Sequence, residues 1–273
     1  MRPASQDSLN KSTWSKASSR DWLDSVDAYT DEGERLALDR IREEVRGAPI
    51  LDLGVGTGRT IPYLRDLTDD YRAIDYLPSM VDAARARFPG TRIDVGDARD
   101  LAGVPSKHFG LVNFSFNGID AVGPIDRRRV LDSVLRVLMP GGVFFFSTLN
   151  IDGPPYRDRP WHVGFDRASN PLRTAARAAR AIGAACLDMW NWTRVRKATE
   201  IGAGYAVAPL RAHHYGVLVH FTTLARERDE LAQAGFAREI EVLDSHTGAR
   251  VTSASDVSQV AWFHVLARRP ANG

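Results

Sequence analysis

The feature that most constrains this chain is an apolar segment followed by a loop with glycine at every second position. Residues 50–60 read Ile-Leu-Asp-Leu-Gly-Val-Gly-Thr-Gly-Arg-Thr, with Gly54, Gly56 and Gly58 in the loop and Asp52 just before it. Glycine adopts backbone dihedrals closed to other residues and lets a ligand approach the main chain. A buried strand that ends in such a loop is typical of the carboxyl edge of a parallel sheet. The segment therefore predicts an α/β fold with a nucleotide-type ligand site at this loop.

The spacing of the glycines bears on the kind of ligand. The dinucleotide fingerprint is G-x-G-x-x-G, with the phosphates on a helix N-terminus, whereas this loop reads G-x-G-x-G. A carboxylate at Asp52 would repel a pyrophosphate and would accept hydrogen bonds from an ammonium group. A cationic amino-acid moiety therefore suits the loop better than a dinucleotide.

The acid and the three glycines resemble the first motif of the class I S-adenosylmethionine-dependent methyltransferases, and the resemblance extends over about residues 30–150. It implies S-adenosylmethionine as cofactor and S-adenosylhomocysteine as product. It also implies that Asp75 takes the two ribose hydroxyls and that Tyr76 and Met80 flank the adenine. Taken alone, Asp75 would be a capping or surface carboxylate and Met80 would be core packing.

Two later segments extend the resemblance. In Val-Gly-Asp-Ala at 95–98, it implies that the Asp97 carboxylate accepts from the adenine amino group and that the Ala98 backbone lies near the ring. Asp97 alone would be a turn residue. The segment at 138–143 resembles the turn that enters the fifth strand. Order and spacing together favour a methyltransferase over a dehydrogenase.

The order of apolar segments predicts a doubly wound, mostly parallel seven-stranded sheet. Strands are expected near 49–54, 70–75, 91–95, 109–116, 142–148, 236–243 and 258–267. The last two should form an antiparallel hairpin, because the segment between them is too short for a crossover helix. The expected organisation is an N-terminal segment at 1–30, a cofactor-binding core at 31–150, an inserted cap at 151–215 and the end of the core at 216–273.

The N-terminal segment is expected to be partly disordered or to act as a lid. Residues 1–20 are rich in Ser, Lys and Arg and should be poorly ordered unless they dock on the body. Over 21–45, apolar residues recur at a spacing that indicates an amphipathic helix: Leu36, Leu38, Ile41 and Val45. For Tyr29 two interpretations stay open, a lid over the methionine end of the cofactor and a hydrophobic staple for this helix.

The end of the fourth expected strand should place polar groups where the acceptor meets the methyl group. Ser115 is a candidate for cofactor binding and Asn117 for catalysis. Some amino-group methyltransferases carry Asn or Asp followed by prolines here, and Asn117 matches only the first residue of that pattern. Asn117-Gly118 is equally an ordinary turn sequence.

The expected cap at 151–215 is more basic than the chain as a whole, with ten Arg or Lys against five Asp or Glu. It contains an Ala- and Arg-rich helix from about Leu172 to Trp192, with Arg173, Arg177 and Arg180 on one face. This face would suit an acidic or phosphorylated acceptor, and a solvated helix surface is the alternative. A helix is also expected at 223–234.

Histidines near the cap are the natural base candidates. The segments 193–207 and 213–222 are expected to form two strands. A neutral histidine can take a proton from a hydroxyl or ammonium nucleophile, which makes His162, His213 and His214 candidates for catalysis. The alternative for each is a hydrogen-bonded structural histidine. Their spacing does not suit a metal site, so none is predicted.

Composition narrows the function. Net charge is +2 with a pI near 8.8, and the basic residues are scattered, so a nucleic-acid partner is not expected. The single Cys186 excludes a disulfide framework, and without a leader or membrane-spanning run the expected location is the cytoplasm. We expect methyl transfer from S-adenosylmethionine to an oxygen or nitrogen of a small, acidic or aromatic acceptor. The alternatives are an RNA or protein methyltransferase that uses the basic cap, and a non-catalytic cofactor-binding regulator.

Overall fold

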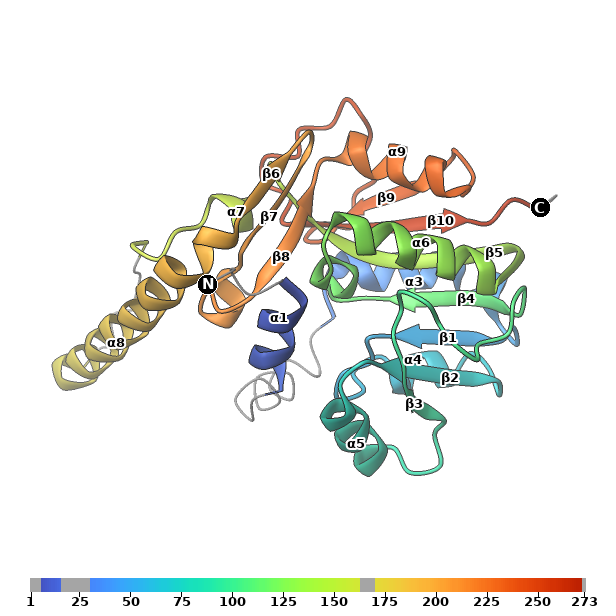
Figure 1. Cartoon of the computed structure of the whole chain (residues 1–273), viewed down its shortest axis with the longest axis horizontal. Coiled ribbons are helices and arrows are strands. Elements are labelled where there is room, and N and C mark those ends of the chain that lie inside the picture. Colours follow the sequence, from blue (N-terminus) through green and yellow to red (C-terminus); the bar gives the residue numbers. More distant parts are fainter. Residues whose placement is uncertain (1–5, 16–29, 163–169, 272–273) are drawn as a thin grey trace.

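The computed structural model describes residues 6–15, 30–162 and 170–271. Its strands form one sheet with helices on both faces (Figure 1). The strands are β1 (Ile50–Leu53), β2 (Tyr71–Asp75), β3 (Ile93–Val95), β4 (Phe109–Phe114), β5 (Leu138–Asn150), β6 (Glu200–Gly202), β7 (Tyr205–Pro209), β8 (Leu218–Thr222), β9 (Glu241–Asp244) and β10 (Trp262–Arg268).

Seven of these strands form the predicted doubly wound core, in the order β3-β2-β1-β4-β5-β10-β9. β1 to β5 run parallel to one another, whereas β10 lies antiparallel to both β5 and β9. The predicted C-terminal hairpin is therefore confirmed. The carboxyl ends of β1, β2, β3 and β4 meet at one edge of the sheet, where the predicted ligand residues lie.

Three further strands extend this sheet, so the expectation of seven strands was too low. β8 pairs in parallel with the last two residues of β5, and β7 and β6 follow as antiparallel neighbours. The two strands predicted at 193–207 and 213–222 had wrong boundaries. The preceding helix continues to Val195, which is buried, and Gly204 adopts a positive φ of 75° in the tight turn between β6 and β7.

Helices cover both faces of the core. They are α1 (Gln6–Trp14), α3 (Glu32–Val45), α4 (Ile61–Arg65), α5 (Pro78–Arg87), α6 (Pro124–Val137), α7 (Pro154–Arg157), α8 (Pro171–Val195) and α9 (Leu224–Ala234), with 3-10 turns η1 (Gly118–Ala121), η2 (Arg196–Ala198) and η3 (Arg211–His213). The apolar face of α3 packs with α4 and α5 on one side, while α6 and α9 pack on the other. Alternation along β5 sends Phe144 and Phe146 to one face and Phe145 to the other.

Within the N-terminal segment, the helix α1 docks on the body of the protein. Asn10 of α1 is 1% exposed. Its side-chain amide donates to the carbonyls of Ala121 and Leu218 at 3.0 and 2.7 Å, and its oxygen accepts from the Leu218 backbone at 2.9 Å. A buried polar side chain that satisfies backbone groups of two segments fixes α1 against the body.

Candidate functional site

The loop after β1 has the geometry that its glycines predict. Gly54 and Gly56 adopt positive φ angles of 61° and 55° and line a cavity of about 960 Å³. A Cβ at Gly54 would lie 2.7 Å from the Phe114 ring, so glycine is required for both conformation and space. Gly58 is outside the cavity wall. A Cβ there would lie 2.5 Å from the Phe88 ring, so glycine is needed for the packing of the loop.

Asp52 does not face the cavity, which corrects the expectation that it receives a ligand ammonium group. It is 1% exposed and accepts hydrogen bonds from the Thr60 hydroxyl at 2.5 Å, the Tyr71 hydroxyl at 2.7 Å and the Asn113 amide at 2.6 Å. Burial raises its pKa. The carboxylate therefore ties β1 to its neighbours and supports the loop from behind.

Asp75 ends β2 and does line the cavity. Its oxygens accept from the backbone nitrogens of Gly56 and Leu77, both at 2.9 Å, so it also fixes the glycine loop. Burial raises the pKa of this carboxyl to about 6. Tyr76 and Met80 also line the cavity.

Asp97 and Ala98 lie in the cavity wall after β3, but the Asp97 carboxylate is engaged by a neighbour. Arg99 donates to both of its oxygens through Nε, at 2.9 and 3.0 Å, and through Nη2 at 2.5 Å. Partial burial opposes ionisation, and these bonds to Arg99 hold the Asp97 pKa below its usual value. An adenine amino group would therefore share this carboxylate with a guanidinium.

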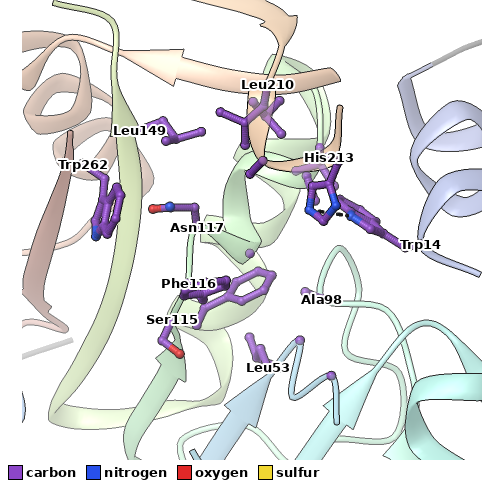
Figure 2. Close-up of a pocket in the computed structure, with 18 of the residues that line it drawn as sticks. Trp14, Leu53, Ala98, Ser115, Phe116, Asn117, Leu149, Leu210, His213 and Trp262 are labelled. Atoms are coloured by element: carbon purple, nitrogen blue, oxygen red, sulfur yellow. Dashed lines mark hydrogen bonds between the residues drawn. The ribbon is translucent and has the colours of Figure 1, made fainter. Parts of the chain in front are cut away.

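A strained loop follows β4 and carries Asn117. Phe116 and Asn117 adopt left-handed φ angles of 54° and 58°, a conformation that is costly for phenylalanine. The Asn117 backbone nitrogen donates to the Ser147 hydroxyl at 2.7 Å. Its side-chain oxygen is buried without a protein partner, and the amide points toward the side of the cavity formed by Trp262 and Leu149 (Figure 2). The loop thus brings an amide side chain, whose oxygen has no partner in the protein, into the cavity wall.

A buried ion pair supports this loop, and sequence reasoning missed it. Arg59 follows the glycine loop and donates to both carboxylate oxygens of Glu34 at 2.6 and 2.7 Å. The same guanidinium donates to the Ser115 hydroxyl at 2.9 Å and lies 5.2 Å from the centre of the Phe116 ring. Ser115 lines the cavity, so the pair connects α3 and the glycine loop to the strained segment.

The three histidine candidates differ in position. His213 lines the cavity, and burial lowers its pKa to about 4. The Trp14 indole donates to its Nε2 at 3.3 Å, and because indole can only donate, a neutral His213 carries its proton on Nδ1. His162 lies at the rim with 57% of its side chain exposed. His214 does not line the cavity. Its Nδ1 lies 2.7 Å from the Asp188 carboxylate on α8.

Two tryptophans complete the wall, and no local pattern identified either of them as a site residue. Trp14 comes from α1, and its ring lies edge-on to that of Tyr76 with centroids 6.3 Å apart. Trp262 begins β10, and its indole donates to Asp31 at 3.0 Å. Asp31 also caps α3 and lies 2.7 Å from His264 Nε2. The predicted lid residue Tyr29 lies outside the described residues.

The described residues hold no cluster of three or more His, Cys, Asp or Glu that could bind a metal. None of the described helices has the length and apolar character needed to cross a membrane.

Comparison with known proteins gives the family. The profile of a family described as a methyltransferase domain matches residues 50–142. A malonyl-[acyl-carrier protein] O-methyltransferase from Serratia marcescens is 31% identical over 188 residues, which cover 65% of this chain and 71% of that protein. A dTDP-3-amino-3,6-dideoxy-alpha-D-glucopyranose N,N-dimethyltransferase from Streptomyces fradiae is 25% identical over 82% of each chain.

Among solved structures, an S-adenosylmethionine-dependent methyltransferase from Mesorhizobium loti has a TM-score of 0.55 at 22% identity, over 87% of this chain and 98% of that one. It shares the fold. The chain belongs to the S-adenosylmethionine-dependent methyltransferase family, whose members are enzymes with S-adenosylmethionine as cofactor.

The chain spans less than two thirds of the length of some curated relatives. The chain spans 3% of a probable non-canonical nonribosomal peptide synthetase, CymA, from Salinispora arenicola, which is 28% identical over 81% of this chain. It spans 65% of a probable S-adenosylmethionine-dependent methyltransferase from Mycolicibacterium smegmatis, which is 28% identical over 66% of this chain.

Proposed function

We propose that the chain transfers the methyl group of S-adenosylmethionine to an oxygen or nitrogen of a neutral, largely aromatic or apolar small molecule. The observation that carries this proposal is the continuity of the cavity. One half, which we call the cofactor half, is lined by Gly54, Gly56, Asp75, Tyr76, Met80, Asp97 and Ala98. The other, the acceptor half, is lined by Leu149, Leu210, His213, Val219 and Trp262.

The cofactor half fits S-adenosylmethionine through its own chemistry. Asp75 offers oxygen lone pairs to the ribose hydroxyls, and Tyr76 and Met80 offer apolar surface to the adenine. Asp97 and the Ala98 backbone would face the adenine edge, and Ser115 would lie near the methionine end. Asp52 and Gly58 have no direct role in this proposal, because both lie behind the cavity wall.

The bound cofactor supplies an activated methyl group, so the protein mainly aligns and desolvates the acceptor. The unpartnered Asn117 oxygen can accept a hydrogen bond from an N–H or O–H nucleophile and orient its lone pair. His213 is poorly suited to remove the proton, because its Nε2 lone pair already accepts from Trp14. We therefore assign His213 a positioning role and His214 none in transfer.

Charged groups at the rim of the acceptor half support a neutral acceptor over an acidic one. Arg211 is ion-paired with Asp158. Arg157 donates to the backbone carbonyls of Gly153, Asp152 and Ser258. An acidic acceptor would have to compete with these contacts, whereas an apolar ring would pack on Trp262 and Leu210.

The cavity also supports a division of labour along the chain. We propose that residues 31–150 bind the cofactor and that 151–215 contribute to the acceptor half through Pro154, Pro155, Leu210 and His213. The remainder, 216–273, completes the sheet and adds Trp262. The N-terminal segment 1–30 would act as a lid, since Trp14 of α1 already covers part of the cavity.

Two measurements on one variant test the proposal. Asn117→Gly keeps the left-handed backbone accessible but removes the unpartnered oxygen. We expect unchanged S-adenosylhomocysteine affinity by calorimetry, and a fall of about 10–100-fold in methyl transfer to a panel of aromatic amines and phenols, followed by mass spectrometry. Cofactor binding without transfer to any of these acceptors by the unmodified protein would contradict the proposed function and favour a cofactor-binding regulator.

A further inference from the structure

α8 carries an apolar face that the described residues leave exposed. Leu172, Ala176, Ala179, Gly183, Cys186 and Trp190 recur at alternating spacings of four and three, which places them on one side of the helix, and all six are exposed. Leu172 and Trp190 are 80% and 67% exposed, and the neighbouring Ile182 is 62% exposed. α8 extends away from the sheet (Figure 1), so this face is open to a partner.

A short row of arginines borders the apolar face. Arg173 and Arg180 each follow a member of that face by one position, and both are exposed. The only acid in α8, Asp188, is 6% exposed and binds His214 on the opposite side of the helix. The outer surface of α8 is therefore apolar along its centre and positively charged along one edge.

The C-terminal half of α8 is held firmly against the body, so the face has a fixed direction. Asn191 donates to the His214 carbonyl at 2.9 Å, and the Trp192 ring packs edge-on against Tyr215 with centroids 5.2 Å apart. Val195 is 3% exposed. A surface presented by an anchored helix loses little conformational entropy on binding.

The side chains on the exposed face of α8 indicate which kind of partner would bind it. A second copy would bring both arginine rows to the interface without an exposed acid of α8 to balance them. Bulky exposed side chains such as Leu172, Ile182 and Trp190 would also suit a membrane surface. The small residues Ala176, Ala179 and Gly183 between them form a central strip that admits another helix at close distance, and this favours a helix as the occupant. We propose that this face docks an acidic amphipathic helix of a partner protein, with apolar residues along the centre and carboxylates opposite the arginines.

Fluorescence anisotropy with the full-length protein tests this. The probe is a labelled synthetic amphipathic helix of about three heptads, with Leu and Ala at its apolar positions and Glu on its flanks. A matched peptide carries Lys in place of Glu. We expect the Glu peptide to bind at least about tenfold more tightly, with an affinity that falls as salt rises.

Variants locate the contact. Gly183→Glu should abolish binding of the Glu peptide, because it places a negatively charged side chain in the central strip. Arg180→Glu should weaken binding of the Glu peptide and strengthen binding of the Lys peptide. Arg238→Glu is the control, because it makes the same charge change at an exposed position after α9. Retained S-adenosylhomocysteine binding shows that each variant is folded.

Three results would overturn the proposal. The first is that the Glu and Lys peptides bind with equal affinity, or that neither of them binds. The second is a dimer of the unmodified protein that Gly183→Glu converts to a monomer in analytical ultracentrifugation, because a second copy then covers the face. The third is co-sedimentation with phosphatidylserine-containing vesicles, lost in Arg180→Glu, without binding of the Glu peptide.

Discussion

Replacing Asp75 with asparagine should separate cofactor binding from folding. Asp75 is 5% exposed and accepts one backbone N–H on each carboxylate oxygen, from Gly56 and Leu77. Asparagine keeps the size of the side chain and one of these acceptors, and it removes the negative charge. Two ribose hydroxyls that donated to a carboxylate would then meet a neutral amide.

The expected magnitudes differ for the two properties. A hydrogen bond to a charged group contributes about 1.5–3 kcal/mol, so the variant should bind S-adenosylhomocysteine about 10–100-fold more weakly. For the stability of the folded protein, we expect loss of the buried charge to be favourable. Burial raises the Asp75 pKa from 3.8 to about 6, so the ionised form destabilises the folded protein above pH 6, by on the order of 3 kcal/mol. Removing that charge offsets the lost acceptor for the Gly56 N–H.

Calorimetric titration at pH 8 and a thermal melt of the unliganded protein measure the two effects. The melting temperature should change by no more than about 5 °C. Asp82→Asn makes the same charge change at an exposed position on α5 and should alter neither property. Unchanged affinity in the Asp75 variant, with the control also unchanged, would refute our placement of the ribose.

Three further predictions concern the same cavity. S-adenosylhomocysteine affinity should rise about tenfold from pH 5 to pH 7 and level off above, because the Asp75 pKa of about 6 leaves the carboxyl largely protonated at pH 5; calorimetry across this range that shows no slope would contradict it. Methyl transfer should show no limb from His213 between pH 5.5 and 8, since its pKa is about 4, and a limb lost in His213→Phe but kept in His214→Asn would reverse that assignment. Asn10→Ala leaves the Leu218 N–H without its side-chain acceptor, while the Leu218 carbonyl keeps the Gln6 amide as donor; the change should weaken α1 docking by about 1–3 kcal/mol, which hydrogen exchange in α1 would report, and unchanged exchange would show that α1 is held by other contacts.

Local sequence was sufficient to predict the part of the site built by a single strand and its loop. Gly54, Gly56 and Asp75 lie where their segments predict, because a strand end and its turn depend mainly on adjacent residues. Asp52 shows the limit. In the sheet it lies directly beside Asn113 of β4, whose amide binds it, and this neighbour is fixed by strand register rather than by spacing along the chain.

The acceptor half was less predictable because distant segments build it. Trp262 reaches the wall through the pairing of β10 with β5, and its indole is held by Asp31 from the start of α3. Trp14 lies in a Ser- and Lys-rich segment whose composition indicates disorder. Gly58 matched a ligand motif, yet its neighbour Phe88 gives it a packing role. Such assignments require tertiary contacts.

The length of β5 has a mechanical consequence. This strand pairs with β4 and β10 along its body and with β8 at its end, so one continuous sheet supports the walls of both halves of the cavity. Because a continuous sheet links the two halves, we do not expect them to open by a hinge motion between domains. Ligand exchange should then depend on peripheral pieces, and α1, seated between the two halves, is positioned to set the rate at which product leaves.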